Sequence, residues 1–475
     1  MERKERVEKI KSSLSAEDVF TFEFTTASGI LCTVIYADGI TNKQFLGEQV
    51  LKPLFGYDGT ADLDSLLRSV AFPEIKKCKD EAELCKEILF GNAALLMEGV
   101  QELVAVGVKT VPVRAISEPP TDIAVRGPRE GFIEDIKTNM ALVRKRLSCA
   151  ELLFETVRVG KRSQTAIAVC YLQGIANEKI KDDILQKLKE IDVDVVPDSS
   201  YIAKMLSPRP LSLFKQVGFT EKPDIFTCKI AEGRVGIIVD GSPLAVTLPY
   251  MMIEDFQSAE DYYVSPYRAT FTRFIRFFAL IVGILLPAFY VGAQLFAIQI
   301  IPEDLLLKIA GSVRGLSLSP SMEMFATLLV LEILNEASIR MPKYVGMVLS
   351  IVGALVLGDA AVQAGILSIP TIIIIALSGI CLYTVPNLTD SMSVLRILFV
   401  LIAGTFGPFG IVLFSLFVLY YLVTQEGYGV PLLAPFAPLI GADFRDSLIK
   451  ESYMRLGYRP QVLRLQNKRR QKEKK

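Results

Sequence analysis

The chain contains no histidine among its 475 residues. Histidine supplies many of the general bases and zinc ligands of proteins, so its absence disfavours histidine-containing catalytic triads and most zinc chemistry. A phosphate-binding glycine loop, a metal-ligand cluster and a nucleophile motif are also missing. The sequence therefore predicts a protein that is not an enzyme and that uses no cofactor and no metal.

The N-terminus lacks the features of a signal peptide. Its first twenty residues, MERKERVEKIKSSLSAEDVF, are charged and have no apolar core. The seven cysteines are scattered without CxxC spacing, which argues against a disulfide framework. We expect the N-terminal half to be cytoplasmic, with reduced thiols.

Charge and hydropathy divide the chain into unlike parts. The formal net charge is zero, but apolar residues crowd positions 277–424 and basic residues crowd the last thirty positions. The sequence predicts an α/β cytoplasmic region of two similar subdomains, followed by an all-α polytopic membrane domain. The expected parts are 1–115, a linker with a connecting helix at 116–149, 150–262, a transmembrane domain at 263–424 and a basic cytoplasmic tail at 425–475.

Two stretches of the N-terminal half repeat one another. Residues 29–40 (GILCTVIYADGI) and 164–175 (QTAIAVCYLQGI) are β-rich runs, each followed by an asparagine and a helical pattern at an offset of 135 positions. Residues 91–106 and 233–248 each predict two strands around an acidic-glycine turn. The repeated order of strand, helix and hairpin predicts a duplication, with chance similarity as the alternative.

A segment rich in proline and glycine, ISEPPTDIAVRGPREGF (116–132), separates the two predicted subdomains and should be non-helical. Apolar residues at helical spacing from Ile133 to Leu147 then predict an amphipathic helix. The many basic residues suit phosphate or lipid headgroups, with a solvated linker as the competing interpretation. The candidate structural linker motif consists of Glu118, Arg126, Gly127, Pro128, Arg129 and Gly131.

The second half contains apolar runs of membrane-spanning length. Residues 277–301 are uncharged and exceed the ~20 residues that a helix needs to cross a bilayer. Residues 344–367 and 369–386 predict a tight helical hairpin, and residues 394–423 predict a long final span with a break near 404–408. These runs predict about four spans.

The segment 321–339 differs because Glu323, Glu332 and Glu336 interrupt it. A central charge facing lipid costs several kcal/mol, so we expect a re-entrant, interfacial or protein-facing helix. Three arginines precede the first span and eleven lysines and arginines fall within 445–475. By the positive-inside rule, the segment before the first span and the segment after the last span should both be cytoplasmic. This requires an even number of spans.

Polar residues within these apolar runs are candidates for an ion path. Glu332 and Glu336 share a helical face with Asn335 beside them, and Asp359 and Gln363 repeat the spacing of four. Hydrocarbon does not solvate a carboxylate, so these side chains should face water or a protein partner. The alternative is that they form hydrogen bonds between helices, with Asp359 capping a helix. The pattern does not decide between a pore and a scaffold.

Two long motifs resemble one known family. The segment SEPPTDIAVRGPREGFIEDIKTNMALVRKRL (117–147) resembles the signature of the A subunits of bacterial spore germinant receptors. LEILNEASIRMP (331–342) and SIVGALVLGDAAVQAGILS (350–368) resemble the membrane core of that family. The resemblance covers roughly residues 20–455. Departures such as Met140, where a threonine is common, leave the paralogue open.

The resemblance implies an integral protein of the inner spore membrane with a cytoplasmic N-terminal domain and tail. It implies a homo-oligomer that assembles with a permease-like B subunit and a lipoprotein C subunit, contacts membrane lipids and binds no nucleic acid. A subunits of this family are thought to form a gated channel. The implied function is a nutrient-sensing receptor subunit that releases monovalent cations at the start of germination.

Two other functions remain open at this point. A transporter or permease component would also place acidic residues inside the membrane, although the membrane half lacks the internal repeat typical of transporters. A paralogous channel that amplifies germination without binding a nutrient would carry the same motifs. A ring of subunits would favour a channel, and a monomer with a cavity near the bilayer centre would favour a transporter.

Overall fold

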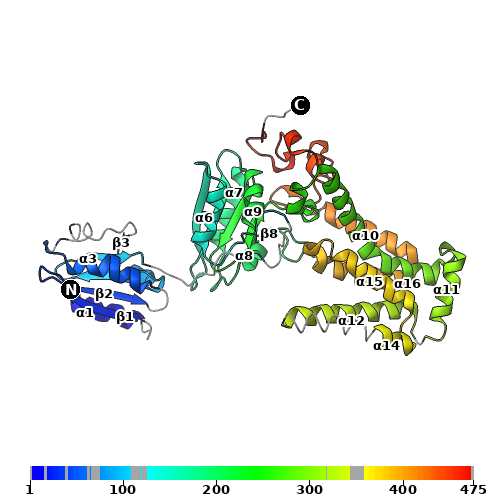
Figure 1. The fold of residues 1–475 in the computed structure, drawn as a ribbon, viewed down its shortest axis with the longest axis horizontal. Coiled ribbons are helices and arrows are strands. Elements are labelled where there is room, and N and C mark those ends of the chain that lie inside the picture. Colours follow the sequence, from blue (N-terminus) through cyan, green and yellow to red (C-terminus); the bar gives the residue numbers. More distant parts are fainter. Residues whose placement is uncertain are drawn as a thin grey trace. The chain divides into compact units, whose positions relative to one another are not determined.

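A computed structural model shows two compact units, Met1–Arg114 and Ala115–Lys475 (Figure 1). The structure describes residues 3–14, 19–37, 41–60, 62, 65, 75–108, 119, 126–316, 318–342 and 358–471. The predicted α/β region and helical region are both present in these residues.

The first unit is a three-layer α/β sandwich. Its antiparallel sheet has the order β1-β2-β4-β5-β3. The strands are β1 (Val19–Thr25), β2 (Leu31–Ala37), β3 (Ile75–Cys78), β4 (Ala93–Met97) and β5 (Leu103–Val106). One face packs against α1 (Arg3–Leu14) and α5 (Glu81–Leu89), and the other against a helical segment formed by α2 (Lys43–Phe45), a π-helical stretch (Leu46–Leu51) and α3 (Lys52–Phe55). Neighbouring residues such as Val34 and Ile35 therefore enter opposite cores.

The second unit begins with the same architecture. Its sheet has the order β6-β7-β9-β10-β8, again fully antiparallel. The strands are β6 (Leu152–Val159), β7 (Thr165–Leu172), β8 (Gly218–Thr220), β9 (Val235–Val239) and β10 (Ala245–Leu248). Helices α6 (Ile136–Arg146) and α9 (Pro223–Ala231) pack on one face, while α7 (Glu178–Glu190) and α8 (Ser199–Leu206) pack on the other.

The two sheets confirm the predicted repeat. Each has the same strand order, and the matched asparagines cap the equivalent helices: Asn42 accepts from the Phe45 amide at 2.9 Å and Asn177 from the Lys179 amide at 3.1 Å. Both hairpin turns use a glycine with positive φ, Gly99 at 81° and Gly241 at 84°. The same local rules therefore build both subdomains.

The helix predicted within the linker segment, α6, packs on the second sheet. Its buried residues Ile136 and Val143 join a core formed with strand residues such as Ala168 and Ile238. Helix α1 holds the corresponding place in the first unit, where Val7 and Ile10 pack beneath the sheet. The repeating unit thus starts with a helix and an outer strand, two elements before the first strand that the sequence pattern indicated.

The rest of the second unit is helical. It contains α10 (Pro266–Phe296), α11 (Glu303–Val313), α12 (Pro320–Arg340), α14 (Gly358–Gln363), α15 (Ile369–Leu382) and α16 (Thr389–Val423). By length and apolar composition, two described segments are able to cross a membrane: Pro266–Phe296 and Pro386–Val423. We call the helices α10 to α16 the membrane module. Most of the predicted span 344–367 lies outside the described residues, so that span stays a prediction.

Several of these helices begin with serine and proline. Ser319 caps α12 and Ser368 caps α15, and each is followed by a proline in the first turn. Helix α10 starts in the same manner with Ser265 and Pro266, without a side-chain cap. A serine oxygen satisfies a free backbone amide, and proline loses nothing at a position where no helical hydrogen bond exists. The sequence thereby fixes where each helix starts.

The break predicted in the final apolar run is a reversal of the chain. Gly407 has φ 59° and ψ −153° inside α16. The rings of Phe399 and Phe414 lie 4.7 Å apart, whereas a straight helix would separate their Cα atoms by about 22 Å. Both ends of α16 contact the α/β subdomain, because Ser391 donates to the Leu213 carbonyl and Arg209 donates to the carbonyl of Thr424. The segment is therefore a helical hairpin, and the expected single pass is corrected to two arms, 389–406 and 408–423.

The C-terminal tail returns to the base of the first membrane helix. The backbone amide of Lys450 donates to the Thr270 hydroxyl of α10 at 3.0 Å, and Arg459 donates to the Ala231 carbonyl of the second sandwich at 2.9 Å. The described tail and the second α/β subdomain thus lie on one side of the membrane module, as the charge pattern predicts.

Candidate functional site

Glu332 of α12 lies in a partly buried ion pair with Arg396 of α16. A carboxylate oxygen of Glu332 accepts from Arg396 Nη2 at 2.7 Å, and the two side chains are 27% and 1% exposed. An isolated charge at such a place is costly, and the pair offsets part of that cost. The structure thus gives this predicted ion-path residue a partner on another helix.

The carbonyl that Pro287 of α10 leaves free connects two more helices to Arg396 by hydrogen bonds. Pro287 lies inside α10 and has no backbone N–H, so the carbonyl of Gly283, four residues earlier, lacks its helical donor. Ser378 of α15 donates to that carbonyl at 2.5 Å and accepts from Arg396 Nη1 at 3.1 Å. Helices α10, α12, α15 and α16 therefore meet at one buried guanidinium.

Arg396 was not among the residues predicted from the sequence. The signal available was a lone arginine inside the apolar run 394–423. Charged residues within such runs usually face the interior and pair with another polar group. Identifying that group as Glu332 requires the tertiary fold.

Glu336 lies one turn beyond Glu332 in a different environment. It accepts from Arg340 Nε at 2.7 Å, and both side chains are well exposed. Asn335 is partly buried on the same helix. An exposed pair of this type contributes little stability, so its charges remain available to a neighbouring chain or to water.

Asp359 and Gln363 lie on α14, a helix of six residues. Gln363 Nε2 donates to Asp359 Oδ2 at 2.7 Å, and both side chains are exposed in the single chain. Asp359 stands in the first turn of this helix. The structure thus joins these two predicted residues to each other and places the remaining three on α12.

The segment that contains the linker motif packs against the second sandwich through Glu130 and Phe132. Glu130 pairs with Lys145 at 3.0 Å and Arg146 at 2.8 Å, both on α6. The Phe132 amide donates to the Glu221 carbonyl at 2.7 Å. Gly131 is buried next to Phe132, whereas Pro128 is partly buried and Arg126 and Arg129 are exposed. Glu118 lies outside the described residues.

Gly127 is the tightest point of that motif. Its φ is 113°, a region that favours glycine, and an added Cβ would lie 2.7 Å from the Tyr263 ring. Tyr263 follows η3 (Ala259–Tyr262), just before α10. The motif therefore contacts the segment that leads into the first membrane helix.

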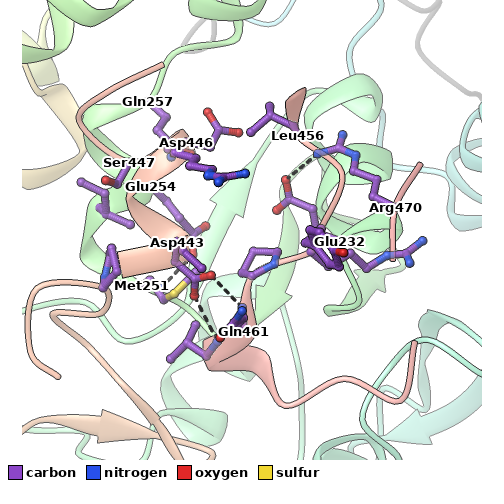
Figure 2. Close-up of a pocket in the computed structure, with 18 of the residues that line it drawn as sticks. Glu232, Met251, Glu254, Gln257, Asp443, Asp446, Ser447, Leu456, Gln461 and Arg470 are labelled. Atoms are coloured by element: carbon purple, nitrogen blue, oxygen red, sulfur yellow. Dashed lines mark hydrogen bonds and ion pairs between the residues drawn. The ribbon is translucent and has the colours of Figure 1, made fainter. Parts of the chain in front are cut away.

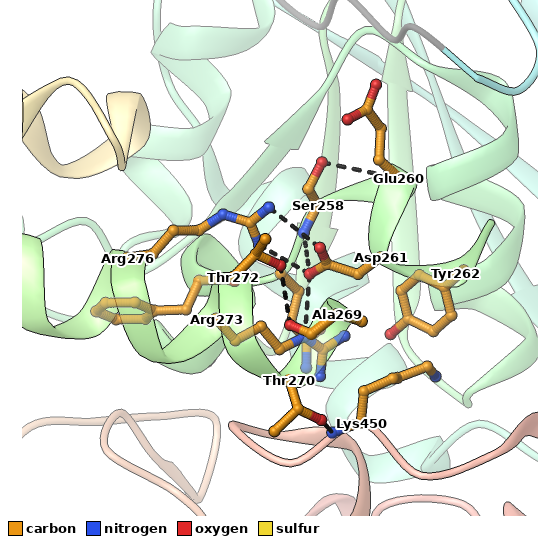
Figure 3. A network of polar contacts seen from close by, with 12 residues as sticks. Ser258, Glu260, Asp261, Tyr262, Ala269, Thr270, Thr272, Arg273, Arg276 and Lys450 are labelled. Carbon is orange, nitrogen blue, oxygen red and sulfur yellow. Dashed lines mark hydrogen bonds and ion pairs between the residues drawn. The ribbon is translucent and has the colours of Figure 1, made fainter. Parts of the chain in front are cut away.

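A second polar network fixes the start of α10. Asp261 accepts from Arg273 Nε at 3.0 Å and Arg276 Nη1 at 2.8 Å (Figure 3). Arg273 also donates to the backbone carbonyls of Asp446 and Ser447 in the tail. Burial would raise the pKa of Asp261, but the hydrogen bonds and positive charges of the arginines hold it below its ordinary value. Arg273, predicted only as an orientation signal, thus also ties the tail to α10.

A cavity of about 340 Å³ lies between the second sandwich and the tail. Figure 2 shows Glu232 facing Arg470 across it, and Asp443 turned toward Gln461. Burial raises the pKa of Glu232, although two arginines oppose the effect. Burial also acts to raise the pKa of Glu254, but Arg234 and Lys229 lower it to about 2. The acidic side chains Glu232 and Glu254 of the cavity wall are therefore paired with basic side chains.

Comparison with known proteins decides the family. A family model described as Bacillus/Clostridium GerA spore germination protein matches residues 7–462. The chain belongs to the GerA family. Spore germination protein KA of Bacillus subtilis (strain 168) is 32% identical over 92% of this chain and 82% of its own. Spore germination protein GerLA of Bacillus cereus is 32% identical over 97% of this chain and 95% of its own.

One solved structure also aligns with this GerA-family chain. The crystal structure of the N-terminal domain of the A subunit of the Bacillus megaterium spore germinant receptor GerK3 covers 51% of this chain and 92% of its own, at 22% identity. The TM-score is 0.22, so the alignment carries no argument about the fold.

Membership of the GerA family confirms the resemblance found in the two sequence motifs. It makes the chain a spore germination protein and an A subunit of a germinant receptor, which is not an enzyme. The two segments able to cross a membrane agree with an integral membrane protein.

Substituting Gly127 in this GerA-family chain tests the linker motif. Gly127→Val should lower the melting temperature and the amount of assembled receptor, because a side chain there is strained and meets the Tyr263 ring. Gly174→Val is the matched control, since Gly174 also has positive φ but has open space around its Cβ position. Adding Tyr263→Ala should restore part of the loss only in the Gly127 variant. Normal receptor levels and stability in Gly127→Val would contradict the assignment.

Proposed function

We propose that this chain is the A subunit of a nutrient-sensing germinant receptor and that copies of it form a gated cation channel in the inner spore membrane. The observation that carries the proposal is the exposure of Asp359 and Gln363 on the membrane module of a single chain. A carboxylate facing lipid is costly, whereas the same carboxylate facing other copies across a water-filled path attracts cations.

The exposed residues of α12 support the same arrangement. Glu336 and Arg340 form a surface pair in the single chain, and Asn335 lies beside them. Glu332 contributes differently, because its carboxylate pairs with Arg396 and would act by holding α12 in place. In the proposed channel Asp359 forms an acidic ring and Glu336 a second ring.

The proposed assembly contains further parts. A permease-like B subunit would bind the nutrient and a lipoprotein C subunit would complete the receptor, with the A-subunit domain and tail in the cytoplasm. Nutrient binding would then shift the channel toward its open state, which is a coupling between two distinct sites.

Asp359→Asn removes the negative charge at the proposed ring but keeps the shape of the side chain. The variant should assemble normally but release monovalent cations more slowly, by roughly tenfold if the ring supplies about 1.4 kcal/mol of attraction. Flux from vesicles that contain the assembled receptor measures this. Asp304→Asn on α11 is the control, because Asp304 is also an exposed carboxylate of the membrane module but lies outside the proposed path. Unchanged flux in Asp359→Asn would remove Asp359 from the path.

A further inference from the structure

A second polar cluster is enclosed where α10, α12 and α15 meet. It consists of Tyr290 and Gln294 on α10, Glu323 on α12, and Ser368 and Thr371 at the start of α15. Glu323, Ser368 and Thr371 are at most 1% exposed. Tyr290 lies next to Thr371, Ser368, Gln294 and Glu323. Each of these side chains presents oxygen to its neighbours.

Glu323 has no cationic side chain to balance it among the described residues. Its carboxylate accepts from the Ser368 amide at 2.5 Å, at the beginning of α15. The partial positive charge of a helix N-terminus offsets only part of a full negative charge. An ionised carboxylate that is 1% exposed inside a membrane module needs a further positive partner.

Two neighbouring oxygens lack hydrogen-bond partners in the described part of the chain. The Tyr290 hydroxyl is one, on a side chain that is 7% exposed, and Gln294 Oε1 is the other. Leaving such buried atoms unsatisfied is energetically costly. Ser368 and Thr371 add two hydroxyl oxygens that lie 2.9 Å apart. The cluster thus combines a single unbalanced carboxylate with two unpartnered neutral oxygens and two hydroxyls that bond to each other.

We propose that Tyr290, Gln294, Glu323, Ser368 and Thr371 bind one monovalent cation. One carboxylate and four neutral oxygens match a single positive charge, whereas sites for Ca²⁺ usually supply several carboxylates. The cation would balance Glu323 and would join α10, α12 and α15. This site differs from the proposed channel residues and does not depend on flux through them.

The test measures the melting temperature of the purified full-length chain in nanodiscs. KCl and NaCl are titrated against N-methylglucamine chloride at equal ionic strength. Binding of either cation should raise the melting temperature as the concentration increases. Glu323→Gln should abolish this rise, while Asp304→Asn, which changes an exposed carboxylate of α11, should keep it.

Tyr290→Phe provides an independent test. The hydroxyl makes no hydrogen bond of normal geometry, so this variant should be close to the parent in stability in N-methylglucamine chloride. It should nevertheless need about five times more K⁺ or Na⁺ for the same shift, because one ligand is gone. An equal melting temperature in all three salts, a full shift in Glu323→Gln, an unchanged midpoint in Tyr290→Phe, or a response to Ca²⁺ or Mg²⁺ alone would each overturn the proposal.

Discussion

Arg396→Ala is expected to lower the free energy of unfolding of the membrane module by about 3–5 kcal/mol. The substitution leaves the Glu332 carboxylate without its buried partner and removes the donor to Ser378. Four helices meet at this guanidinium, so the loss should also reduce the yield of folded protein. Thermal unfolding of the purified chain in nanodiscs measures the effect.

Two further variants make this result specific. Arg340→Ala breaks the exposed pair with Glu336 and should cost less than about 1 kcal/mol. Replacing both Arg396 and Glu332 with methionine removes both buried charges together and should recover much of the stability lost in Arg396→Ala. Equal losses in Arg396→Ala and Arg340→Ala, or a double variant as unstable as the single one, would contradict the buried-pair interpretation.

Gly407→Ala is expected to disrupt the hairpin of α16. The φ and ψ values of Gly407 fall in a region that is essentially restricted to glycine, where strain costs about 1–3 kcal/mol. An added Cβ would also lie 2.7 Å from the Phe296 ring. We expect a lower melting temperature. Gly311→Ala is the control, because Gly311 lies in a regular helix with open space around it, and alanine there should be neutral or stabilising.

Spin labels at Val394 and Leu419 measure the hairpin directly. Both side chains are about half exposed, one on each arm. In a straight helix the two Cα atoms would be about 38 Å apart. The folded-back arms should bring the labels to less than about 25 Å. A distance near 38 Å in the parent chain would show that α16 is a single long span.

Much of the α/β half could be predicted from the sequence because its helices and turns depend on local sequence patterns. Three patterns recur in both α/β subdomains: alternating apolar residues, an asparagine cap before the helix that follows β2 or β7, and a glycine in the hairpin turn. Each pattern acts within a few residues. The outer strands β1 and β6 were missed. In β1 the residues Phe20, Phe22 and Phe24 alternate with polar residues, but of these three only Phe24 is buried.

The membrane half was harder to predict from the sequence, because the reversal of α16 and the environments of its polar residues depend on contacts between residues distant in the chain. The glycines and Pro408 near position 407 indicated a break, but only the backbone angles at Gly407 and the contact of Phe399 with Phe414 show that the chain reverses. Glu332 and Glu336 share one spacing pattern, yet Glu332 is partly buried in an ion pair with Arg396 whereas Glu336 is exposed. Charge spacing alone does not distinguish these environments.

The central claim is that this chain provides the path for cations. The most direct measurement is the release of monovalent cations from spores after nutrient addition, comparing spores with and without this chain. The account predicts that early release disappears without the chain and returns with the intact chain, but returns only slowly with Asp359→Asn. Normal early release in spores that lack the chain, with no other A subunit responding to that nutrient, would contradict it.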